Sequence, residues 1–326
     1  MIRLVALLVF ALLAHATLAS GYVSHPAYPA FEQRMVQEHG FKPAELRRLF
    51  SQAERKDAIL EAIARPAEKR LTWGEYRKLF ITPARIDGGV AFWRANSAEL
   101  ARAGERFGVA PEIVVAIIGV ETRYGGNMGS WRVLDALTTL AFDYPPRSQF
   151  FGSELEQYLV MTREQGFDPL ALKGSYAGAM GMGQFIPSSF RAYAVDFDGD
   201  SRADIWNSRS DAIGSVANYF NRHGWTHGER VVDRASPTGP IAVERMNPGL
   251  DPNTRVEELP ALGVRPQADL PPGELVLPLM LETDSGMEYW LGRHNFYVIT
   301  RYNRSPLYAM AVHELSQAIL AAYTRP

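Results

Sequence analysis

The run PEIVVAIIGV at residues 111–120 is the feature of this sequence that most constrains its fold. Pro111 suits the first turn of a helix, and Ile113, Ile117 and Ile118 recur at the spacing of one helical face. A helix with so apolar a face has to be covered by other parts of the chain. The run therefore predicts a buried helix within a mainly helical domain.

A single carboxylate, Glu121, follows this run. It lies three and four residues after two isoleucines of the apolar face, so it projects from that same face. Burial favours the protonated form of a carboxyl group, which a general acid working near neutral pH needs. We expect the pair Gly125–Gly126 to end the helix and to leave the carboxyl group at the edge of a cleft. From this segment alone, a structural ion pair with Arg123 or Arg132 explains the glutamate equally well.

A second segment, GSYAGAMGMGQFIPSSF at residues 174–190, combines glycines with polar and apolar side chains. Its glycines at 174, 178, 181 and 183 allow the backbone to come close to another group. The segment lacks the pattern of a phosphate-binding loop. The hydroxyl of Ser175, the thioether of Met180 and the amide of Gln184 suit an N-acetyl sugar, which offers an amide and an apolar ring face. The alternative is a tight loop that packs one helix on another.

The start of the chain has the pattern of a secretory signal peptide, expected at residues 1–19. Arg3 precedes an apolar run at 4–14, and small residues permit cleavage after Ala19. The run is too short to cross a bilayer about 30 Å thick, which disfavours the alternative of a membrane helix. The chain has no cysteine, so it has no disulfide and no cysteine that could carry a lipid. We expect a periplasmic protein without a membrane anchor.

The sequence after the expected signal peptide predicts several domains. A net charge of −2 gives no basic surface for nucleic acid. Helical periodicity dominates until a proline-rich segment at 233–275, after which the runs LVLPLML and FYVITRY are typical of strands. The expected domains are a helical domain at 20–80, a catalytic core at 81–228, a small β-containing module at 229–303, and a C-terminal helix at 304–326 that packs back on the helical domain.

Three motifs, GVETRYG at 119–125, GAMGMGQFIPSSF at 178–190 and DAIGSVANYF at 211–220, together resemble the lytic murein transglycosylases of the B type. The resemblance implies a mainly α fold with a lysozyme-like catalytic core. It also implies cleavage of the β-1,4 bond between N-acetylmuramic acid and N-acetylglucosamine in peptidoglycan, which leaves a 1,6-anhydromuramic acid end. Glu121 stands where the family has its single catalytic glutamate. The substrate-binding residues that we expect are Tyr76, Arg147, Ser175, Met180, Gln184, Tyr219, Tyr302, Asn303 and Tyr308.

One catalytic carboxylate is enough for this chemistry, whereas a hydrolytic glycosidase normally needs two. The neighbouring acids Asp135 and Asp143 suit a helix surface and a turn. We expect Glu121 to act first as acid and then as base, while the N-acetyl carbonyl of the substrate stabilises the oxocarbenium centre. The alternatives are a muramidase of the same fold in which water attacks, and a non-catalytic scaffold that binds the wall. The expected partners are peptidoglycan glycan strands and proteins of cell-wall synthesis.

The acidic segment DFDGDSRADIWNSRSD at 196–211 resembles a calcium-binding loop. Asp196, Asp198 and Asp200 occupy positions one, three and five of such a loop, and the carbonyl oxygen of Arg202 occupies position seven. The resemblance to the B-type family, whose loop is longer, adds Asp211 as the distal ligand.

Two positions depart from the usual calcium loop. Ser201 replaces the customary glycine, and Asn207 stands where a bidentate glutamate is usual. We expect Ca²⁺ in a structural role, with Na⁺ as the alternative ion and no organic cofactor. Without a metal, the segment would be an acidic turn whose Asp211 caps the following helix.

Overall fold

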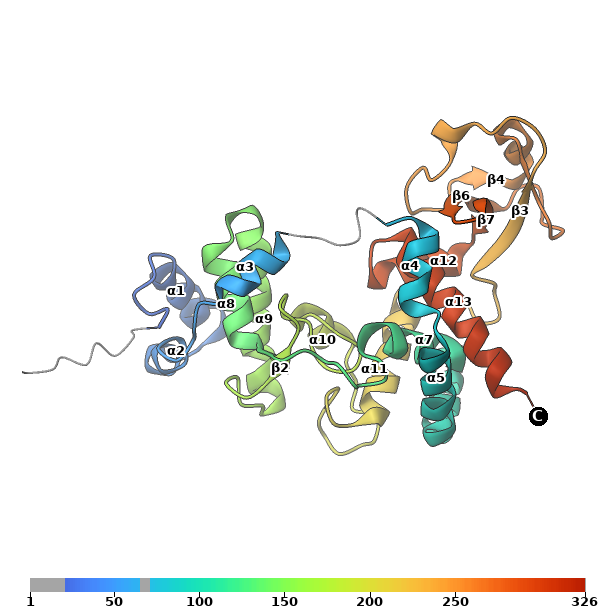
Figure 1. Ribbon diagram of the computed structural model, residues 1–326. Helices are drawn as coiled ribbons and strands as arrows, with labels where there is room; N and C mark the ends of the chain where they lie inside the picture. The colour runs from blue at the N-terminus through green and yellow to red at the C-terminus, as the bar shows by residue number, and fades with distance from the viewer. Residues whose placement is uncertain (1–20, 65–70, 326) are drawn as a thin grey trace, which may run out of the picture. The chain divides into compact units, whose positions relative to one another are not determined.

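The computed structural model describes residues 21–64 and 71–325 (Figure 1). They fall into two compact units, with the boundary between Arg55 and Lys56. The expected signal peptide at 1–19 lies outside the described residues.

The first unit contains the helices α1 (Tyr28–His39) and α2 (Pro43–Phe50). A proline lies in the first turn of each helix, and Gly40 ends α1 in the left-handed conformation with φ 66°. The rings of Phe31 and Phe50 pack with their centroids 5.3 Å apart. The helical character predicted for this part of the chain is confirmed.

The second unit is mainly helical. Its helices are α3 (Asp57–Ile63), α4 (Trp73–Phe80), α5 (Pro83–Ala95), α6 (Ser97–Phe107), α7 (Pro111–Thr122), α8 (Val133–Asp143), α9 (Ser148–Gln165), α10 (Pro187–Tyr193), α11 (Arg209–Arg222), α12 (His294–Tyr302) and α13 (Pro306–Tyr323). Helix α7 packs against α13, α5, α11 and α6, and its residues 113–120 are buried. The predicted buried helix and the mainly α class are both confirmed.

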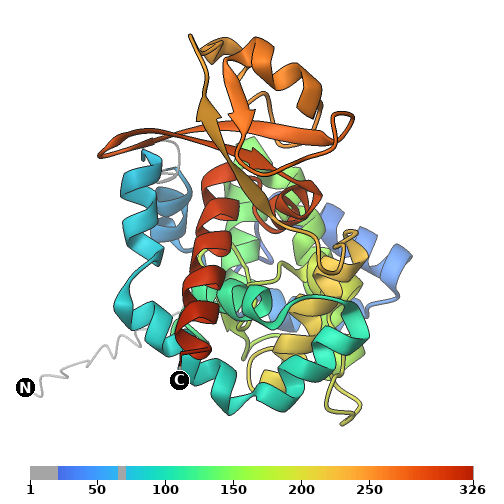
Figure 2. The ribbon, with the colours of Figure 1, turned by 90° about the vertical axis from the view of Figure 1, so that its right-hand side faces the viewer.

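A small antiparallel sheet lies at one end of this unit (Figure 2). Its strands are β3 (Val232–Pro237), β4 (Thr254–Arg255), β5 (Val264–Pro266), β6 (Leu275–Thr283) and β7 (Gly286–Gly292), in the spatial order β4-β6-β7-β3-β5. Buried apolar residues such as Leu259, Val276 and Leu291 form a core of its own. A separate pair, β1 (Trp131–Arg132) and β2 (Lys173–Gly174), lies among the helices.

One predicted strand is a helix. The run LVLPLML forms β6 as expected, but FYVITRY belongs to α12. Its β-branched and aromatic residues favour a strand locally, whereas Phe296, Ile299 and Thr300 share the spacing of one helical face and are all buried. Tertiary burial of that face outweighs the local preference.

Helix α13 begins at Pro306 as predicted, and the Ser305 hydroxyl accepts a hydrogen bond from the backbone NH of Tyr308. It packs against α7, α5, α12 and α4, and Figure 2 shows it running away from the sheet. Within residues 21–64 and 71–325, no helix has the length and apolar character needed to span a membrane.

Candidate active site

Glu121 lies at the end of α7, where the buried helix reaches a partly exposed position. The hydroxyl of Tyr308, in the first turn of α13, donates a hydrogen bond to Glu121 Oε1 over 2.5 Å. Burial, and next the charge of Glu121, raise the pKa of Tyr308 well above its ordinary value. The tyrosine therefore remains a hydrogen-bond donor to the carboxylate throughout the physiological pH range.

Helix α7 ends at Thr122, before the predicted glycine pair, because Arg123 adopts the left-handed conformation with φ 52°. Tyr124, with φ 62°, holds this ending in place, since its hydroxyl donates to the carbonyl of Arg85 over 2.6 Å. The Arg85 guanidinium in turn donates to the carbonyl of Gly119 at the end of α7. These contacts add side-chain hydrogen bonds to the last turn of α7 and connect it to α5, so they fix the backbone that carries Glu121.

The ring of Tyr124 needs glycine at position 119. A Cβ atom there would lie 2.6 Å from the Tyr124 hydroxyl oxygen, closer than real Cβ contacts. We expect Gly119→Ala to lower the free energy of unfolding by about 1–3 kcal/mol, because the core would be overpacked, and to lower activity by displacing Glu121. The matched control is Gly152→Ala in α9, where nothing lies within 4 Å of the added carbon. Urea unfolding and cleavage rates measure both variants, and equal behaviour of the two would contradict the assigned role of Tyr124.

The glycines of the 174–190 segment contact this chain itself. A Cβ atom on Gly181, which has φ 67°, would lie 2.5 Å from the side chain of Ile205, and one on Gly183 would lie 2.9 Å from the Tyr302 hydroxyl. The glycines therefore serve internal packing, the alternative that the sequence left open, rather than a close approach to a ligand.

Gln184 is held at the edge of this loop. It has φ 52°, and its side-chain NH₂ donates to the carbonyls of Met128, over 3.2 Å, and Gly181, over 3.0 Å. The Tyr302 hydroxyl donates to the carbonyl of Gly183 over 2.5 Å. Burial, and next the charge of Glu121, raise the pKa of Tyr302 well above its ordinary value. Tyr302 thus lies in the surroundings of Glu121, and Gln184 directly follows the glycine whose carbonyl Tyr302 binds.

Thr122 connects α7 to the loop, a role that no motif in the sequence indicated. Its buried hydroxyl donates to the carbonyl of Met182 over 2.9 Å, while the Met182 NH donates to the carbonyl of Ile205 over 2.9 Å. A path of hydrogen bonds therefore runs from Thr122, the neighbour of Glu121, through Met182 to Ile205 within the acidic segment. No motif could reveal it, because Thr122 and Met182 are far apart in the sequence.

Two further tyrosines belong to the same region. The Tyr219 ring lies 4.7 Å from that of Tyr302, and its hydroxyl donates to the carbonyl of Arg301 over 2.5 Å. Tyr76 is buried and lies close enough to Tyr308 to contribute to the raised pKa of that residue. Asn303 directly follows Tyr302 at the end of α12 and is partly exposed.

Three other predicted substrate-binding residues have different surroundings. Met180 is fully buried and exchanges two backbone hydrogen bonds with Phe185, so it supports the loop from within and does not line an open surface. The Ser175 hydroxyl accepts hydrogen bonds from the backbone NH groups of residues 177 and 179, which shapes the turn. Arg147 is exposed, and its guanidinium lies 4.3 Å from the centroid of the Phe150 ring.

Asp135 has a structural role. Its buried carboxylate accepts a hydrogen bond from Arg132 over 2.6 Å and lies 3.9 Å from the Lys56 ammonium group. The carboxylate therefore forms ion pairs with Arg132 and Lys56, as a structural residue does. Arg132 therefore forms its ion pair with Asp135.

The acidic segment folds as a compact loop in which Asp196, Asp198 and Asp211 come together. Each offers a carboxylate oxygen within 4.8 Å of the other two, and Asp211 is fully buried. Ser201 takes the left-handed conformation, with φ 74°, at the position where calcium loops usually have glycine. The oxygen donors and the turn therefore suit a hard cation such as Ca²⁺.

Asp200 lies outside this cluster of three. Its Oδ1 accepts a hydrogen bond from the backbone NH of Arg202 over 2.9 Å. Asp211 Oδ1 accepts from the NH of Phe197 and its Oδ2 from the NH of Asp204, each over 2.7 Å. Asp211 therefore joins the two ends of the loop.

The chain is similar to known proteins in both sequence and structure. Residues 24–317 match the family described as the Transglycosylase SLT domain. The membrane-bound lytic murein transglycosylase B of Escherichia coli is 44% identical over 310 residues, which cover 92% of this chain and 84% of that protein. The soluble lytic transglycosylase SltB1 of Pseudomonas aeruginosa superposes with a TM-score of 0.88 at 51% identity, covering 92% of this chain and 100% of that one. The Escherichia coli lytic transglycosylase SLT35 has a TM-score of 0.86 at 44% identity over 96% of this chain and 99% of that one, and it was solved with calcium and with bulgecin A.

Proposed function

This chain belongs to the lytic transglycosylase family defined by the SLT domain, and on that premise we propose that Glu121 performs both proton transfers of the reaction. Members of the family are lyases that cleave peptidoglycan, and the fold of this chain is lysozyme-like. The observation that carries the proposal is the hydrogen bond from Tyr308 to Glu121 at the end of α7. This hydrogen bond keeps Glu121 Oε1 paired with the hydroxyl of Tyr308.

The first step breaks the glycosidic bond. Because Tyr308 donates to Oε1, the proton for the substrate is assigned to Oε2. Glu121 transfers this proton to the oxygen that leaves with N-acetylglucosamine, and the bond from that oxygen to C1 of N-acetylmuramic acid breaks. The acetamido oxygen of the substrate bonds to C1 and takes the place of the second carboxylate that a retaining glycosidase uses.

The second step closes the anhydro ring. The Glu121 carboxylate now removes the proton from the O6 hydroxyl of the same muramic acid, O6 bonds to C1, and the bond to the acetamido oxygen breaks. Glu121 ends protonated, as it began, and no water is consumed. Gln184, Tyr219, Tyr302 and Tyr76 surround the glycan in this proposal, while Arg147, Ser175 and Asn303 contact it farther from the reacting atoms.

Product mass tests this proposal against hydrolysis by the same fold. We expect purified protein to release muropeptides whose muramic acid ends are one water lighter than those released by a muramidase. Mass spectrometry of digested cell wall measures the difference. Hydrated ends alone would contradict the O6 step and favour the muramidase, and an absence of any released product would favour a wall-binding scaffold.

For the acidic loop we propose Ca²⁺ held by Asp196, Asp198 and Asp211, with the carbonyl of Arg202 as a further ligand. The calcium bound to the relative SLT35 and the three clustered carboxylates of this chain support the proposal. The ion would have a structural role, because the loop is connected to the Met182 backbone. We also propose that the protein works in the periplasm on peptidoglycan strands, in line with the cell-envelope relative and its substrate.

A further inference from the structure

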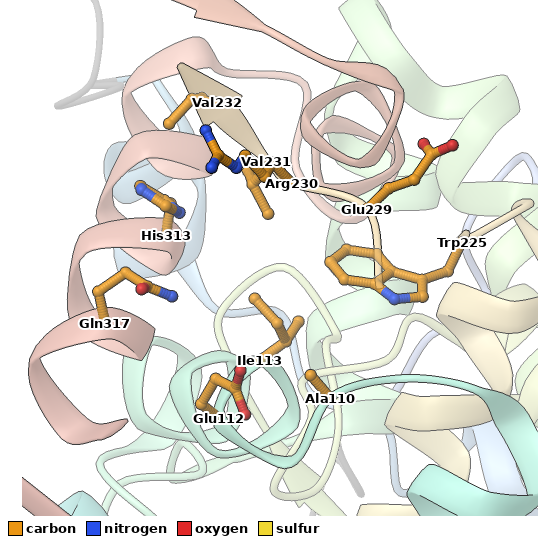
Figure 3. A pocket seen from close by; sticks show the side chains of 10 residues that line it. All are labelled: Ala110, Glu112, Ile113, Trp225, Glu229, Arg230, Val231, Val232, His313 and Gln317. Carbon is orange, nitrogen blue, oxygen red and sulfur yellow. The ribbon is translucent and has the colours of Figure 1, made fainter. Parts of the chain in front are cut away.

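A second site, a cavity of about 320 Å³, lies at the start of α7 and beside the middle of α13 (Figure 3). Glu112 lines it at the start of α7, about 14 Å along the helix axis from Glu121 at roughly 1.5 Å per residue. His313 and Gln317 line it from α13, beyond Tyr308 in the chain. The cavity is therefore separate from the surroundings of Glu121.

The polar side of this cavity has hydrogen-bonding capacity that the protein does not use. The Glu112 carboxyl group lines this side from α7, and the His313 imidazole and the Gln317 amide line it from α13 (Figure 3). The buried Nδ1 atom of His313 has no hydrogen-bond partner within the described part of the chain. Burial lowers the pKa of His313 to about 4, so the ring is neutral at physiological pH and offers one donor and one acceptor. A ligand hydroxyl or amide would satisfy an atom that is costly to leave unpaired.

The other side of the cavity is apolar. Ile113 and Val231 are buried there, and the Trp225 ring faces the cavity in Figure 3. Phe220 packs edge-on against Trp225 at 5.5 Å between centroids, which holds the ring in place. An aromatic ring opposite planar polar side chains suits a pyranose, which has a C–H face and a hydroxylated edge.

The charges around the cavity disfavour an anionic ligand. The Arg230 guanidinium, although it lines the cavity, donates to Asp233 over 2.7 Å, and Arg293 holds the other oxygen of that aspartate. Burial raises the pKa of Glu112, so this carboxyl group would repel an anion when ionised and donate to a neutral ligand when protonated. Both states accommodate a neutral polar ligand.

We propose that this cavity is a second carbohydrate site, which holds one N-acetylglucosamine unit of a glycan strand outside the catalytic cleft. Its volume lies at the small end of the range for ligand pockets, about 300–1,000 Å³, and fits a single sugar unit. The acetamido methyl group would pack on Ile113 and Val231, and the sugar ring on Trp225. The glycan identity rests on the proposed function, while binding at this site requires nothing of Glu121.

A titration of the full chain carrying Glu121→Gln tests the site with N-acetylglucosamine and its β-1,4-linked trimer. Methyl NMR signals report each location, Ile113 at the second cavity and Met182 at the loop near Glu121. We expect saturable shifts of the Ile113 signal, and Trp225→Ala should weaken this binding by at least about tenfold because it removes the aromatic contact. Gln317→Ala changes an exposed position, so it should weaken sugar binding without destabilising the fold. Glu105→Gln, at an exposed position of α6, should leave sugar binding unchanged.

The outcomes separate the two proposals. An Ile113 signal that does not move with sugar, moves equally with inorganic phosphate, or is insensitive to both Trp225→Ala and Gln317→Ala would overturn the second site. Cleavage by Glu121→Gln protein would overturn the catalytic proposal instead, and would leave the Ile113 result standing. A Trp225→Ala protein that still cleaves soluble glycan fragments but sediments less with cell wall would support a holding role.

Discussion

We expect Glu121→Gln to lower the cleavage rate by at least about 10³-fold. General acid–base catalysis contributes about 10²–10⁴-fold, and in the proposed reaction this one residue performs both proton transfers. Glutamine keeps the size of the side chain and can still accept the hydrogen bond from Tyr308, so the helix end and the cleft should persist. It has no proton to give to the leaving oxygen and cannot remove one from O6. Glycan binding should therefore remain while cleavage disappears.

A zymogram on purified cell wall measures this loss, and sedimentation with the same wall measures the retained binding. Glu105→Gln, an identical change at an exposed position of α6, is the matched control and should keep full activity. A Glu121→Gln protein that still clears the zymogram would exclude Glu121 as the acid. If it neither cleaves nor binds, the glutamate has a structural role.

Tyr308→Phe tests the contribution of the hydrogen-bond donor separately from that of the Glu121 carboxylate. It removes one hydrogen bond to a charged group, worth about 1.5–3 kcal/mol, so we expect an intermediate loss of roughly 10–100-fold. The loss should be smaller than that of Glu121→Gln, because the phenylalanine variant retains the proton-transferring group.

The sequence predicted those parts of the site that depend on local pattern. The apolar run requires burial wherever it lies, so α7 and the position of Glu121 at its end were predictable. The spacing of the aspartates predicted a loop of the calcium-binding kind. Ser201 adopts the left-handed conformation there, at the position where such loops usually have glycine. The start of α13 at Pro306 follows from proline in a first turn.

What the sequence did not predict depends on contacts between distant segments. The end of α7 is fixed by Tyr124 and Arg85. The hydrogen bond from the Tyr124 hydroxyl to the Arg85 carbonyl joins two distant segments, so no local pattern reveals it. The pairing of Tyr308 with Glu121 joins two helices, and only the resemblance to a family placed both in one site. His313 is an ordinary helical residue until the fold places it on the same cavity as Glu112. The strand predicted for FYVITRY was wrong for a similar reason, because burial of one helical face in the folded chain outweighed the local strand preference.

Removal of the cation from the acidic loop should have the second largest effect. Three carboxylates with oxygens within 4.8 Å of one another repel when ionised, and backbone NH groups, such as those that bind Asp196 and Asp211, offset only part of this repulsion. Calcium at a hundredfold excess over its dissociation constant stabilises the fold by about 2.7 kcal/mol. At about 2–4 °C per kcal/mol for a unit of this size, we expect a chelator to lower the melting temperature by roughly 5–10 °C.

Asp198→Asn should abolish this response to calcium, because it removes one of the clustered charges from an exposed position. Asp200→Asn should weaken it less, since that carboxylate lies outside the cluster, and the exposed Asp251→Asn serves as the control. Equal melting temperatures with chelator and with calcium would favour an acidic turn capped by Asp211, and full recovery with sodium alone would assign the site to Na⁺. The carbonyl of Ile205, within the acidic segment, accepts a hydrogen bond from the Met182 NH, and the Met182 carbonyl accepts one from Thr122 beside Glu121. Calcium loss should therefore also slow cleavage. A chelated protein that melts earlier yet cleaves at the full rate, when assayed well below its melting temperature, would show that the hydrogen-bond path does not reach the catalytic residue.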